Sequence, residues 1–381
     1  MPPHAVVVGA GIGGLTAALA LRRLGCEVTV LERRTELAEV DTGFLLWAFA
    51  IKRLHQLGLS PGLERIGRPL ERLVTKSAHG TPLSDISLDP LNERIGVPSY
   101  DVHRADLQRL LADAVGRDRI MLASRCAATE QDRTAARAVL EDGPKISGDL
   151  LIGADGVHSA IRRHVAGGTA LRRDAVAIWR GIAELPEHLV PDGVHIRVMG
   201  PGALFGLGRL GAKARWYAGA WAPELRYGGD QQAKGDELTK RFGRWCSPVP
   251  EAIEATDPQS VLLNDAPRLP RLRSWTRSRV VLLGDAAHAT FPSLASGGGM
   301  AIEDACVLAE CLDASANSIE ALRHYERRRR RPAVRIQRTA NAFAYLLAWR
   351  RAPALRLRDL GFRRLPGLQR RAISALMKGR S

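Results

Sequence analysis

The 381-residue sequence predicts an α/β fold in which a doubly wound domain is interleaved with a mixed, largely antiparallel β-sheet and is followed by C-terminal helices. A glycine-rich turn between a strand and a helix, at residues 6–14, predicts the doubly wound part. Short alternating runs broken by glycine and proline, over residues 171–265, predict the antiparallel part. An arginine-rich amphipathic pattern after residue 320 predicts the terminal helices.

The N-terminal unit has the pattern of a Rossmann-like dinucleotide site. An apolar, β-branched run ends at Val8, and glycines follow it with the spacing GxGxxG before a helical pattern begins. These glycines permit a tight turn, a close approach of a pyrophosphate to the backbone, and close packing of helix on strand. Free N–H groups at the start of the helix then face the phosphates. The predicted cradle consists of Gly9, Gly11, Ile12, Gly13 and Gly14.

An acidic residue ends the next predicted strand. Glu32 lies about 20 residues beyond the glycines, where a carboxylate commonly accepts hydrogen bonds from the ribose hydroxyls of a dinucleotide. Arg33 follows directly, and it either helps to hold the adenosine or lies on the surface. This unit does not distinguish a nicotinamide from a flavin dinucleotide, because both contain the same ADP half.

Two further motifs follow apolar strands later in the chain. The stretch LLIGADGVHSAIRR contains Asp155 and Gly156 in a turn, with Arg162 downstream. The stretch RVVLLGDAAH contains Gly284 and Asp285 at the end of another strand. A lone Asp-Gly or Gly-Asp pair is usually an ordinary turn. Their position at strand ends instead favours carboxylates that bind a cofactor.

A glycine-rich loop follows the second of these motifs and leads into a helix. Its residues are Gly297, Gly298, Gly299 and Met300. The glycines let the backbone approach a bound ring, and the positive end of the helix dipole can stabilise negative charge on that ring.

The three motifs, in this order, resemble the class A flavoprotein monooxygenases of the para-hydroxybenzoate hydroxylase type, over residues 4–345. The resemblance implies a non-covalently bound FAD. It implies that Asp285 bonds the ribityl chain and that Asp155 and Gly156 lie near the pyrophosphate, in a motif tied to both FAD and NAD(P)H binding. Arg162 is then a candidate phosphate contact.

One further element fits the family, and two segments depart from it. Arg104 fits an HRxxL element whose arginine reaches the cofactor, the alternative being a solvated arginine in a first helical turn. Ala295 and Ser296 precede Gly297 where relatives usually have GxG, and Met300 stands where a polar amide is frequent. The substrate of any one relative is therefore not carried over.

We expect the antiparallel sheet to form one wall of a substrate pocket, with the flavin as the other wall. The predicted lining residues are Trp179, Phe205, Trp216, Phe291 and Pro292, with Arg180 and Tyr217 as further candidates on the strands. Because side chains alternate between the two faces of a sheet, about half of the strand candidates should point elsewhere. Arg180 is expected to form a structural ion pair, and His288 to be structural rather than a base.

The chain is expected to leave the cofactor domain twice and to return each time. The predicted division is 1–67, 100–165 and 276–345 for the FAD-binding domain, 68–99 and 166–275 for the substrate domain, and 346–381 for a basic, amphipathic, helical C-terminal segment.

No Ser-His-Asp order, metal-ligand spacing or Walker sequence occurs, so no catalytic residue and no metal are assigned and the cofactor carries the chemistry. The resemblance implies that NADPH or NADH, as a transient co-substrate, reduces FAD and that O₂ then gives a C4a-hydroperoxyflavin. This species hydroxylates or epoxidises an aromatic or polyunsaturated small molecule. The alternatives are a flavin-dependent reductase or dehydrogenase, a halogenase on the same fold, and a non-redox binding protein like the Rab GDP-dissociation inhibitors.

The charge balance is strongly basic, with 56 Lys and Arg against 40 Asp and Glu and a net charge of +16. Arg327–Arg331 is an unbroken basic run that fits a solvated helix face, an anionic surface contact or a field that attracts nucleotides. No nucleic-acid partner is predicted. The C-terminal segment is expected to cap the fold, to contact a second subunit in a homodimer, or to lie on a membrane surface.

Composition bounds the location and the redox state. No apolar stretch is long enough to span a membrane, and the first residues, MPPH, run straight into a strand and leave no room for a signal peptide, so we expect a cytoplasmic protein, either monomeric or homodimeric. Five cysteines without CxxC spacing predict neither a disulfide framework nor a zinc site.

Overall fold

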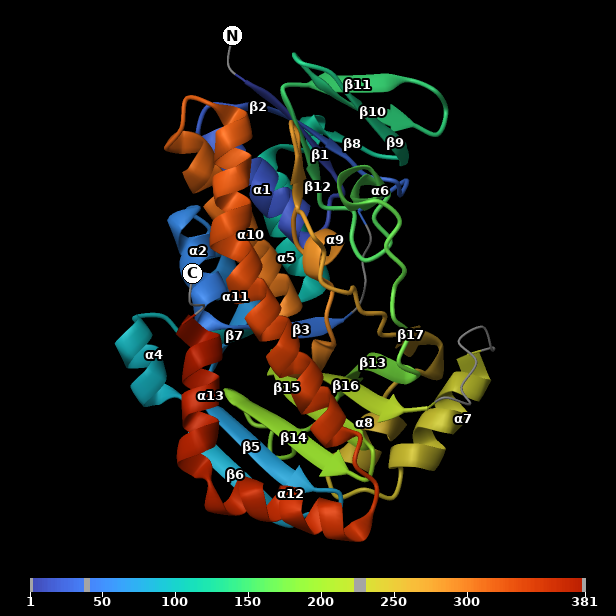
Figure 1. Ribbon diagram of the computed structural model, residues 1–381. Helices are drawn as coiled ribbons and strands as arrows, with labels where there is room; N and C mark the ends of the chain where they lie inside the picture. The colour runs from blue at the N-terminus through green and yellow to red at the C-terminus, as the bar shows by residue number, and fades with distance from the viewer. Residues whose placement is uncertain (1–2, 38–41, 223–230, 379–381) are drawn as a thin grey trace.

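The computed structural model is an elongated α/β molecule with one large sheet in each half (Figure 1). It describes residues 3–37, 42–222 and 231–378. Parts of the predicted domain ranges lie outside the described residues, namely 1–2, 38–41, 223–230 and 379–381.

The upper half in Figure 1 is built on a six-stranded sheet with the order β18-β19-β12-β1-β2-β8. Its strands are β1 (His4–Val8), β2 (Glu27–Leu31), β8 (Ile120–Met121), β12 (Leu150–Gly153), β18 (Thr276–Arg277) and β19 (Val280–Leu282). All neighbouring strands are parallel except the edge pair β18–β19. The β-branched runs form these strands because both faces of a parallel sheet are covered and apolar side chains are buried on each.

Helices cover this sheet and connect its strands. Helix α1 (Ile12–Arg23) follows β1 and contacts both α5 (Arg104–Val115) and α10 (Gly297–Asp313). An antiparallel sheet at the end of this half consists of β9 (Cys126–Gln131), β10 (Ala136–Leu140) and β11 (Lys145–Gly148). The short helices here are η1 (Arg117–Arg119), α6 (Ile161–Ala166), α9 (Asp285–His288) and η3 (Pro292–Leu294).

The lower half is built on a seven-stranded sheet with the order β17-β13-β16-β15-β14-β5-β6. Its strands are β5 (Arg72–Ser77), β6 (Pro82–Ser87), β13 (Val176–Glu184), β14 (Val194–Gly200), β15 (Ala203–Leu210), β16 (Lys213–Trp221) and β17 (Leu262–Asp265). Only the pair β5–β14 is parallel, which confirms the mixed, largely antiparallel sheet. Beside this sheet lie α7 (Gln231–Phe242), α8 (Val249–Glu254) and η2 (Pro258–Ser260).

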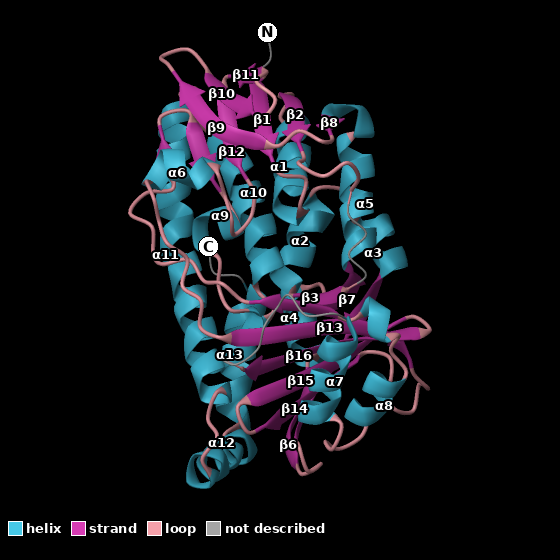
Figure 2. Cartoon of the chain, turned by 90° about the vertical axis from the view of Figure 1, so that its right-hand side faces the viewer, coloured by secondary structure: helices cyan, strands magenta, loops and turns pink. Residues whose placement is uncertain are grey.

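A small antiparallel sheet lies between the two halves (Figure 2). It consists of β3 (Gly43–Leu46), β7 (Ser99–His103) and β4 (Gly67–Leu70), and the helices near it are α2 (Ala48–Gln56), α3 (Ser60–Ile66) and α4 (Asp89–Ile95). The chain leaves the upper half for β5 and β6, returns through β7, and leaves again for β13 to β17. The predicted interleaved α/β fold is therefore confirmed.

Three helices end the described chain: α11 (Ser318–Leu347), α12 (Ala352–Arg364) and α13 (Pro366–Lys378). Helix α11 runs along both halves of the molecule, α12 lies along β6, and α13 returns toward α2 and α4 (Figures 1 and 2). Among the helices of the described ranges, none combines the length and the apolarity that crossing a membrane requires.

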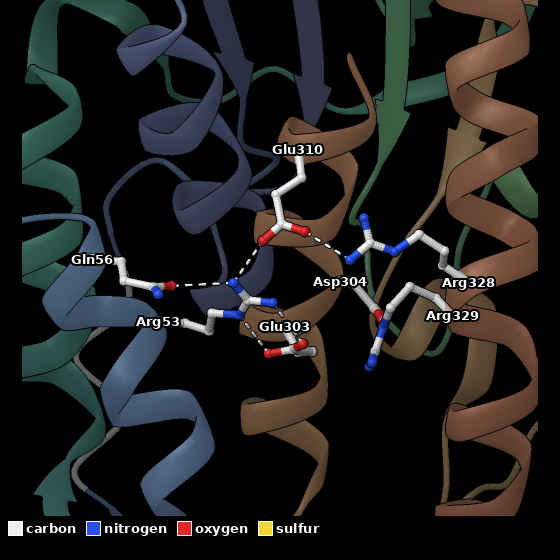
Figure 3. Close-up of polar contacts among 7 residues, drawn as sticks. All are labelled: Arg53, Gln56, Glu303, Asp304, Glu310, Arg328 and Arg329. Atoms are coloured by element: carbon white, nitrogen blue, oxygen red, sulfur yellow. Dashed lines mark hydrogen bonds and ion pairs between the residues drawn. The ribbon is translucent and has the colours of Figure 1, made fainter. Parts of the chain in front are cut away.

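Ion pairs hold α10 between α2 and α11 (Figure 3). Arg53 of α2 donates to Glu303 at 2.9 Å and to Glu310 at 2.6 Å. Glu310 also accepts from Arg328 of α11 at 2.8 Å. Within the basic run of α11, Arg330 pairs with Glu326 as well, at 2.8 Å. A large part of this run therefore serves packing within the fold.

Candidate active site

The first glycine turn has the geometry that close backbone packing requires. Gly9 has φ +108°, and a Cβ on it would lie 2.5 Å from the carbonyl oxygen of Ala154. A Cβ on Gly14 would collide with the carbonyl oxygen of Gly9. By contrast, no atom lies within 4 Å of the Cβ position of Gly11. The space in front of Gly11 is open, where a pyrophosphate would approach the start of α1.

The two glycine motifs, far apart in the sequence, meet in the structure. A Cβ on Gly13 would lie 2.9 Å from the Cβ of Ala301 in α10, and one on Gly284 would lie 3.0 Å from the same atom. Ile12, at the start of α1, is buried in the core. Helices α1 and α10 thus begin side by side, and both glycine-rich starts face one region.

Glu32 supports the glycine turn at the end of β2. Its Oε2 accepts a hydrogen bond from the backbone N–H of Ala10 at 2.9 Å, and its Oε1 accepts one from the N–H of Arg34 at 3.1 Å. Gln108 of α5 donates to the carbonyl oxygen of Ala10 at 2.7 Å. Each carboxylate oxygen has a further lone pair, so bonding to ribose hydroxyls remains open to Glu32. Arg33 is exposed beside it.

Asp155 organises the second motif. Its Oδ2 accepts hydrogen bonds from the N–H groups of Ala160 at 2.7 Å and Ile161 at 3.2 Å, at the start of α6. Burial raises the pKa of Asp155, and these hydrogen bonds oppose that shift. Its Oδ1 is buried and has no partner among the described residues, so it can accept a hydrogen bond from a bound group. Gly156 follows with φ +78°.

Arg162 is buried and connects two loops. It donates from Nη2 to the carbonyl oxygen of Val157 at 2.7 Å and from Nη1 to that of Ala286 at 3.2 Å. Burial lowers the pKa of Arg162, and the charge of Asp155 opposes the shift. These contacts join the Asp155 turn to α9, and a phosphate contact by Arg162 remains a prediction.

Asp285 and Arg104 line one cleft from different elements. Asp285 begins α9 after Gly284, which has φ +59°. The backbone N–H of Arg104 donates to the carbonyl oxygen of Thr42 at 2.8 Å, and the side chain is accessible from the cleft. The surrounding protein atoms lower the pKa of Arg104, whereas the charge of Asp285 raises it. The two charges therefore interact within the same cleft.

The glycine-rich start of α10 presents its backbone to the same cleft. Gly297 and Gly298 line it, and a Cβ on Gly298 would lie 2.9 Å from Cε2 of Phe44. Gly299 is packed more tightly, because its Cβ would lie 2.8 Å from Cζ of Phe49. A larger residue at either position would therefore force the ring of Phe44 or Phe49 to shift.

The residue after these glycines does not present its side chain to the cleft. Met300 is fully buried, so only its backbone can reach a cofactor. Its N–H donates to the carbonyl oxygen of Ser296 at 2.8 Å. The Oγ of Ser296 is buried and has no partner among the described residues.

Asp304 connects α10 to the Gly284 turn, to α9 and to α11. It accepts from the N–H of Gly284 at 3.0 Å, from Arg329 at 2.7 Å, and lies 2.5 Å from Nε2 of His288. Burial alone would raise the pKa of Asp304, but the charges of His288 and Arg329 outweigh it and lower that pKa. His288 lies in the core and not in the cleft wall, as expected of a structural residue.

The cleft is a cavity of about 480 Å³ between the two halves. The glycine starts and Asp285 form one side, and the lower sheet contributes Ile178, Arg180 and Tyr217 to the other. Of the predicted pocket residues, Phe291 and Pro292 line it. Its volume is within the range of sites for small ligands.

The prediction was wrong for the other three pocket residues, Trp179, Phe205 and Trp216. They are buried on the opposite face of the sheet. There the ring centres of Trp179 and Phe205 lie 5.9 and 5.7 Å from the ring centre of Phe242 of α7. The rings of Phe205 and Trp216 stack at 5.3 Å. Alternation along each strand puts these aromatic side chains in the core and gives the cavity face to their neighbours.

Arg180 also differs from the expectation. It forms no ion pair with the described residues, and its Nη1 instead donates to Oδ1 of Asn264 at 3.3 Å. Burial, together with the positive charge of Arg104, lowers the pKa of Arg180 to about 10. The cavity therefore contains an arginine, Arg180, that forms no ion pair with the described residues, which favours an anionic ligand.

A polar chain that no sequence pattern marks runs from the cavity wall into the interior. Oη of Tyr217 lies 3.2 Å from Nε2 of His195, and Nη2 of Arg215 lies 3.3 Å from the Nδ1 of this ring. In the tautomer in which Nδ1 accepts from Arg215, Nε2 donates to Tyr217 and the Tyr217 hydroxyl hydrogen is left for a ligand. Arg215 donates from Nε to Asp101 at 2.8 Å.

Burial sets the protonation states of this chain. It lowers the pKa of His195, and the nearby Arg215 adds to that shift, so the ring is neutral at pH 7. Burial alone would raise the pKa of Asp101, but attraction to Arg215 outweighs it and lowers that pKa. No motif marks these residues, which lie on β7, β14 and β16. The only available signal was the alternation that places Tyr217 on the face opposite Trp216.

Known proteins resemble this chain over most of its length. The model of the FAD binding domain family matches residues 4–340. FAD-dependent urate hydroxylase of Klebsiella pneumoniae is 37% identical over 331 residues, covering 85% of each chain. Aurachin C monooxygenase/isomerase of Stigmatella aurantiaca is 33% identical, covering 89% of this chain and 86% of that protein. The 3-amino-4-hydroxybenzoate 2-monooxygenase of Streptomyces cremeus is 36% identical, covering 88% and 83%.

A solved structure gives the same result. The crystal structure of Klebsiella pneumoniae HpxO complexed with FAD and uric acid superposes with a TM-score of 0.93 at 30% identity, covering 99% of this chain and 97% of that one. The cradle around Gly11, the free Oδ1 of Asp155 and the glycine start of α10 suit the flavin dinucleotide that such proteins bind. The chain therefore belongs to the FAD binding domain family and is a class A FAD-dependent monooxygenase.

Proposed function

We propose that the enzyme hydroxylates an aromatic ring that carries an ionisable hydroxyl group, using FAD, NADH or NADPH, and O₂. The observation that carries this proposal is the Tyr217 hydroxyl, which His195 orients toward the same cavity that the glycine starts of α1 and α10 adjoin. The names of two relatives, urate hydroxylase and 3-amino-4-hydroxybenzoate 2-monooxygenase, support hydroxylation of a ring rather than epoxidation of a polyene.

We infer that FAD is held by the residues of the three motifs. Gly9, Gly11, Ile12, Gly13, Gly14, Glu32 and Arg33 would hold the ADP half, and Arg104, Asp155, Gly156, Arg162, Gly284, Asp285, Gly297, Gly298, Gly299 and the Met300 backbone the remainder. When bound, FAD supplies the electron transfer from the nicotinamide and the activation of O₂.

Tyr217 and Arg180 would prepare the ring for attack. A Tyr217 hydroxyl that donates to the substrate oxygen stabilises the phenolate form, and the charge of Arg180 favours the same anion. A phenolate releases electron density into the ring, so the carbons next to and opposite the oxygen become better nucleophiles. The pair thus places the reactive carbon and raises its reactivity without a metal or a covalent nucleophile.

The apolar part of the cavity would exclude water. Phe291 is buried, and Arg268 lies over its ring at 4.8 Å, so the loop that carries Phe291 and Pro292 is held against α11. A dry cavity limits wasteful release of peroxide. No separate nicotinamide domain is predicted, so we infer that NADH or NADPH docks only transiently in the flavin cleft.

The test is a substrate screen with the FAD-loaded enzyme. Phenols, hydroxyquinolines, urate and polyenes are offered with NADH or NADPH, and nicotinamide oxidation is followed by absorbance. We expect a hydroxyarene to stimulate oxidation and to gain one oxygen by mass. Stimulation only by polyenes that give epoxides would contradict the proposal.

The domain ranges given above, a cytoplasmic location and a monomeric or homodimeric state are further proposals. The interleaved strand order supports the division into a cofactor domain and a substrate domain. Size-exclusion chromatography with light scattering tests the oligomeric state, and vesicle sedimentation tests a peripheral membrane contact of the basic C-terminal segment.

A further inference from the structure

A second cavity, of about 760 Å³, lies beside the candidate active site. Helices α11, α12 and α13 and the strands β5 and β6 enclose it, where the C-terminal helices wrap around the edge of the lower sheet (Figure 1). Its lining is mainly apolar and includes Ile336, Phe343, Leu357, Phe362, Leu365 and Leu368. This cavity is larger than the cavity of the candidate active site.

The lining contains much of the exposed apolar surface of the chain. Leu357, Leu365 and Leu368 are 64%, 52% and 63% exposed, and all three line the second cavity. Trp349, also among the exposed large apolar side chains, lines it too. A concave apolar surface of this kind is a usual binding site for an apolar ligand, because covering it removes hydrocarbon from water.

Three side chains separate the two cavities. Trp47, Arg197 and Leu294 line both of them. The indole N–H of Trp47 donates to the carbonyl oxygen of Leu294 at 2.9 Å, which holds one side of this partition. The guanidinium of Arg197 lies over the ring of Phe343, 5.5 Å from its centre, which holds the other side.

Arg197 also offers a donor at the partition. Its Nε is buried and has no hydrogen-bond partner among the described residues. A buried N–H without a partner is costly, and a ligand oxygen at the junction of the cavities would remove that cost. The boundary between the second cavity and the active-site cavity therefore offers a polar contact to a ligand and is not wholly apolar.

We propose that the second cavity binds a hydrocarbon tail, alkyl or isoprenoid, attached to the aromatic ring that is hydroxylated. This proposal rests on the proposed function, because the ring would occupy the active-site cavity while the tail passes Arg197. The substrate class is then an amphiphilic hydroxyarene with a long apolar substituent. The three residues that line both cavities place the second cavity directly beside the ring site, which favours the tail of the substrate over a membrane surface or a second copy of the chain as the occupant.

The experiment measures binding rather than turnover. The FAD-loaded, full-length protein is titrated with 4-ethylphenol, 4-butylphenol and 4-octylphenol, below their aggregation limits, by calorimetry and by the change in flavin absorbance. We expect the Kd to fall by up to about fourfold per methylene beyond butyl, and by about tenfold or more between butyl and octyl. An octyl compound that binds no tighter than the butyl compound, or a series that does not bind at all, overturns the proposal.

Two variants locate the tail. Thr339→Trp on α11 and Ala375→Trp on α13 each fill the second cavity, whereas Leu360→Trp introduces the same side chain at an exposed position of α12 outside it. We expect the first two to abolish the gain from butyl to octyl and to leave 4-ethylphenol binding unchanged, and Leu360→Trp to keep that gain. Equal effects of all three variants would overturn the proposal.

The other occupants give different results. If the two filling variants reduce sedimentation with anionic phospholipid vesicles, or change the oligomeric state, while the chain-length dependence is unaffected, the tail site is excluded. The proposed function fails separately: tail-dependent binding without oxygen transfer would keep the tail site and overturn the hydroxylase. Hydroxylation of rings regardless of their tails would keep the hydroxylase and overturn the tail site.

Discussion

The hydroxyl oxygen of Tyr217 lies 3.2 Å from Nε2 of His195, which joins a residue of the cavity wall to a buried polar chain. Arg215 occupies the other ring nitrogen of His195, so the tyrosine receives a hydrogen bond and keeps its own hydrogen for the cavity. This arrangement turns an ordinary phenol side chain into an oriented donor.

Replacing this donor should lower activity without unfolding the protein. We expect Tyr217→Phe to lower kcat/KM for a phenolic substrate by about tenfold to a hundredfold, because a hydrogen bond to a charged group contributes about 1.5–3 kcal/mol. Steady-state kinetics with the substrate found by the screen measures the loss. FAD affinity serves as the control, and an unchanged kcat/KM would rule out a role for the Tyr217 hydroxyl.

The pKa of His195 predicts a dependence of stability on pH. Burial lowers this pKa, with Arg215 and Arg197 adding to the shift and Asp101 opposing it. As the pH falls through about 6.5, the unfolded chain takes up a proton at this position while the folded chain resists it. The contribution of His195 to the free energy of unfolding is therefore fully present above that pH and is lost as the pH falls below it.

The matching variant is His195→Gln, which can still donate toward Tyr217 but does not titrate. Urea unfolding from pH 8 to pH 5 should show a shallower loss of stability in the variant than in the natural chain. Identical slopes in the two proteins would mean that the pKa of His195 is the same in the folded and the unfolded chain, which would contradict the predicted shift.

Two glycines of the first motif should have different roles, Gly14 in folding and Gly11 in cofactor binding. Gly14→Ala should destabilise the protein by about 1–3 kcal/mol, because its Cβ would collide with the Gly9 carbonyl oxygen. Gly11→Ala faces open space, so the apoprotein should keep its stability while the Kd for FAD rises by about tenfold or more. Thermal unfolding of the apoproteins and FAD titration measure both effects, and equal FAD affinity of Gly11→Ala and the natural chain would argue against a pyrophosphate there.

Asp304 should be a large contributor to stability. Asp304→Asn leaves Arg329 buried without its counter-charge, and such a loss costs about 3–5 kcal/mol. Because the pKa of Asp304 is lowered, its contribution is present above about pH 4 and is lost as the pH falls below that value.

An exposed carboxylate provides the control for Asp304. Asp85→Asn breaks the exposed pair with Arg72 and should cost much less than the loss of the buried pair, because solvent screens exposed charges. Urea unfolding compares the two variants at pH 7. Similar losses for both would show that the buried pair does not anchor the Gly284 loop.

The structure brings together residues that the sequence assigns to the cofactor, whereas it separates those that the sequence assigns to the substrate pocket. Gly9, Gly11 and Asp285 follow strands in the chain itself, so local patterns place them near one another once the parallel sheet forms. The choice of Trp179 failed, because an aromatic side chain on a strand suits a core as well as a pocket, and only the register decides its face.

The chain of Tyr217, His195, Arg215 and Asp101 could not be read from the sequence, because its members come from three strands of two sheets. None of these residues lies in a recognisable sequence motif. Only the packing of β7 against the lower sheet brings the Asp101 carboxylate to Arg215 and thereby fixes the proton on His195.

The central claim is that this chain uses FAD to place an oxygen atom from O₂ on a ring. The most direct measurement is the mass of the product formed under ¹⁸O₂ in ordinary water, with NADPH or NADH as the electron source. We expect one ¹⁸O atom in each product molecule. A product that carries no label, or that takes its oxygen from ¹⁸O-labelled water, would contradict it.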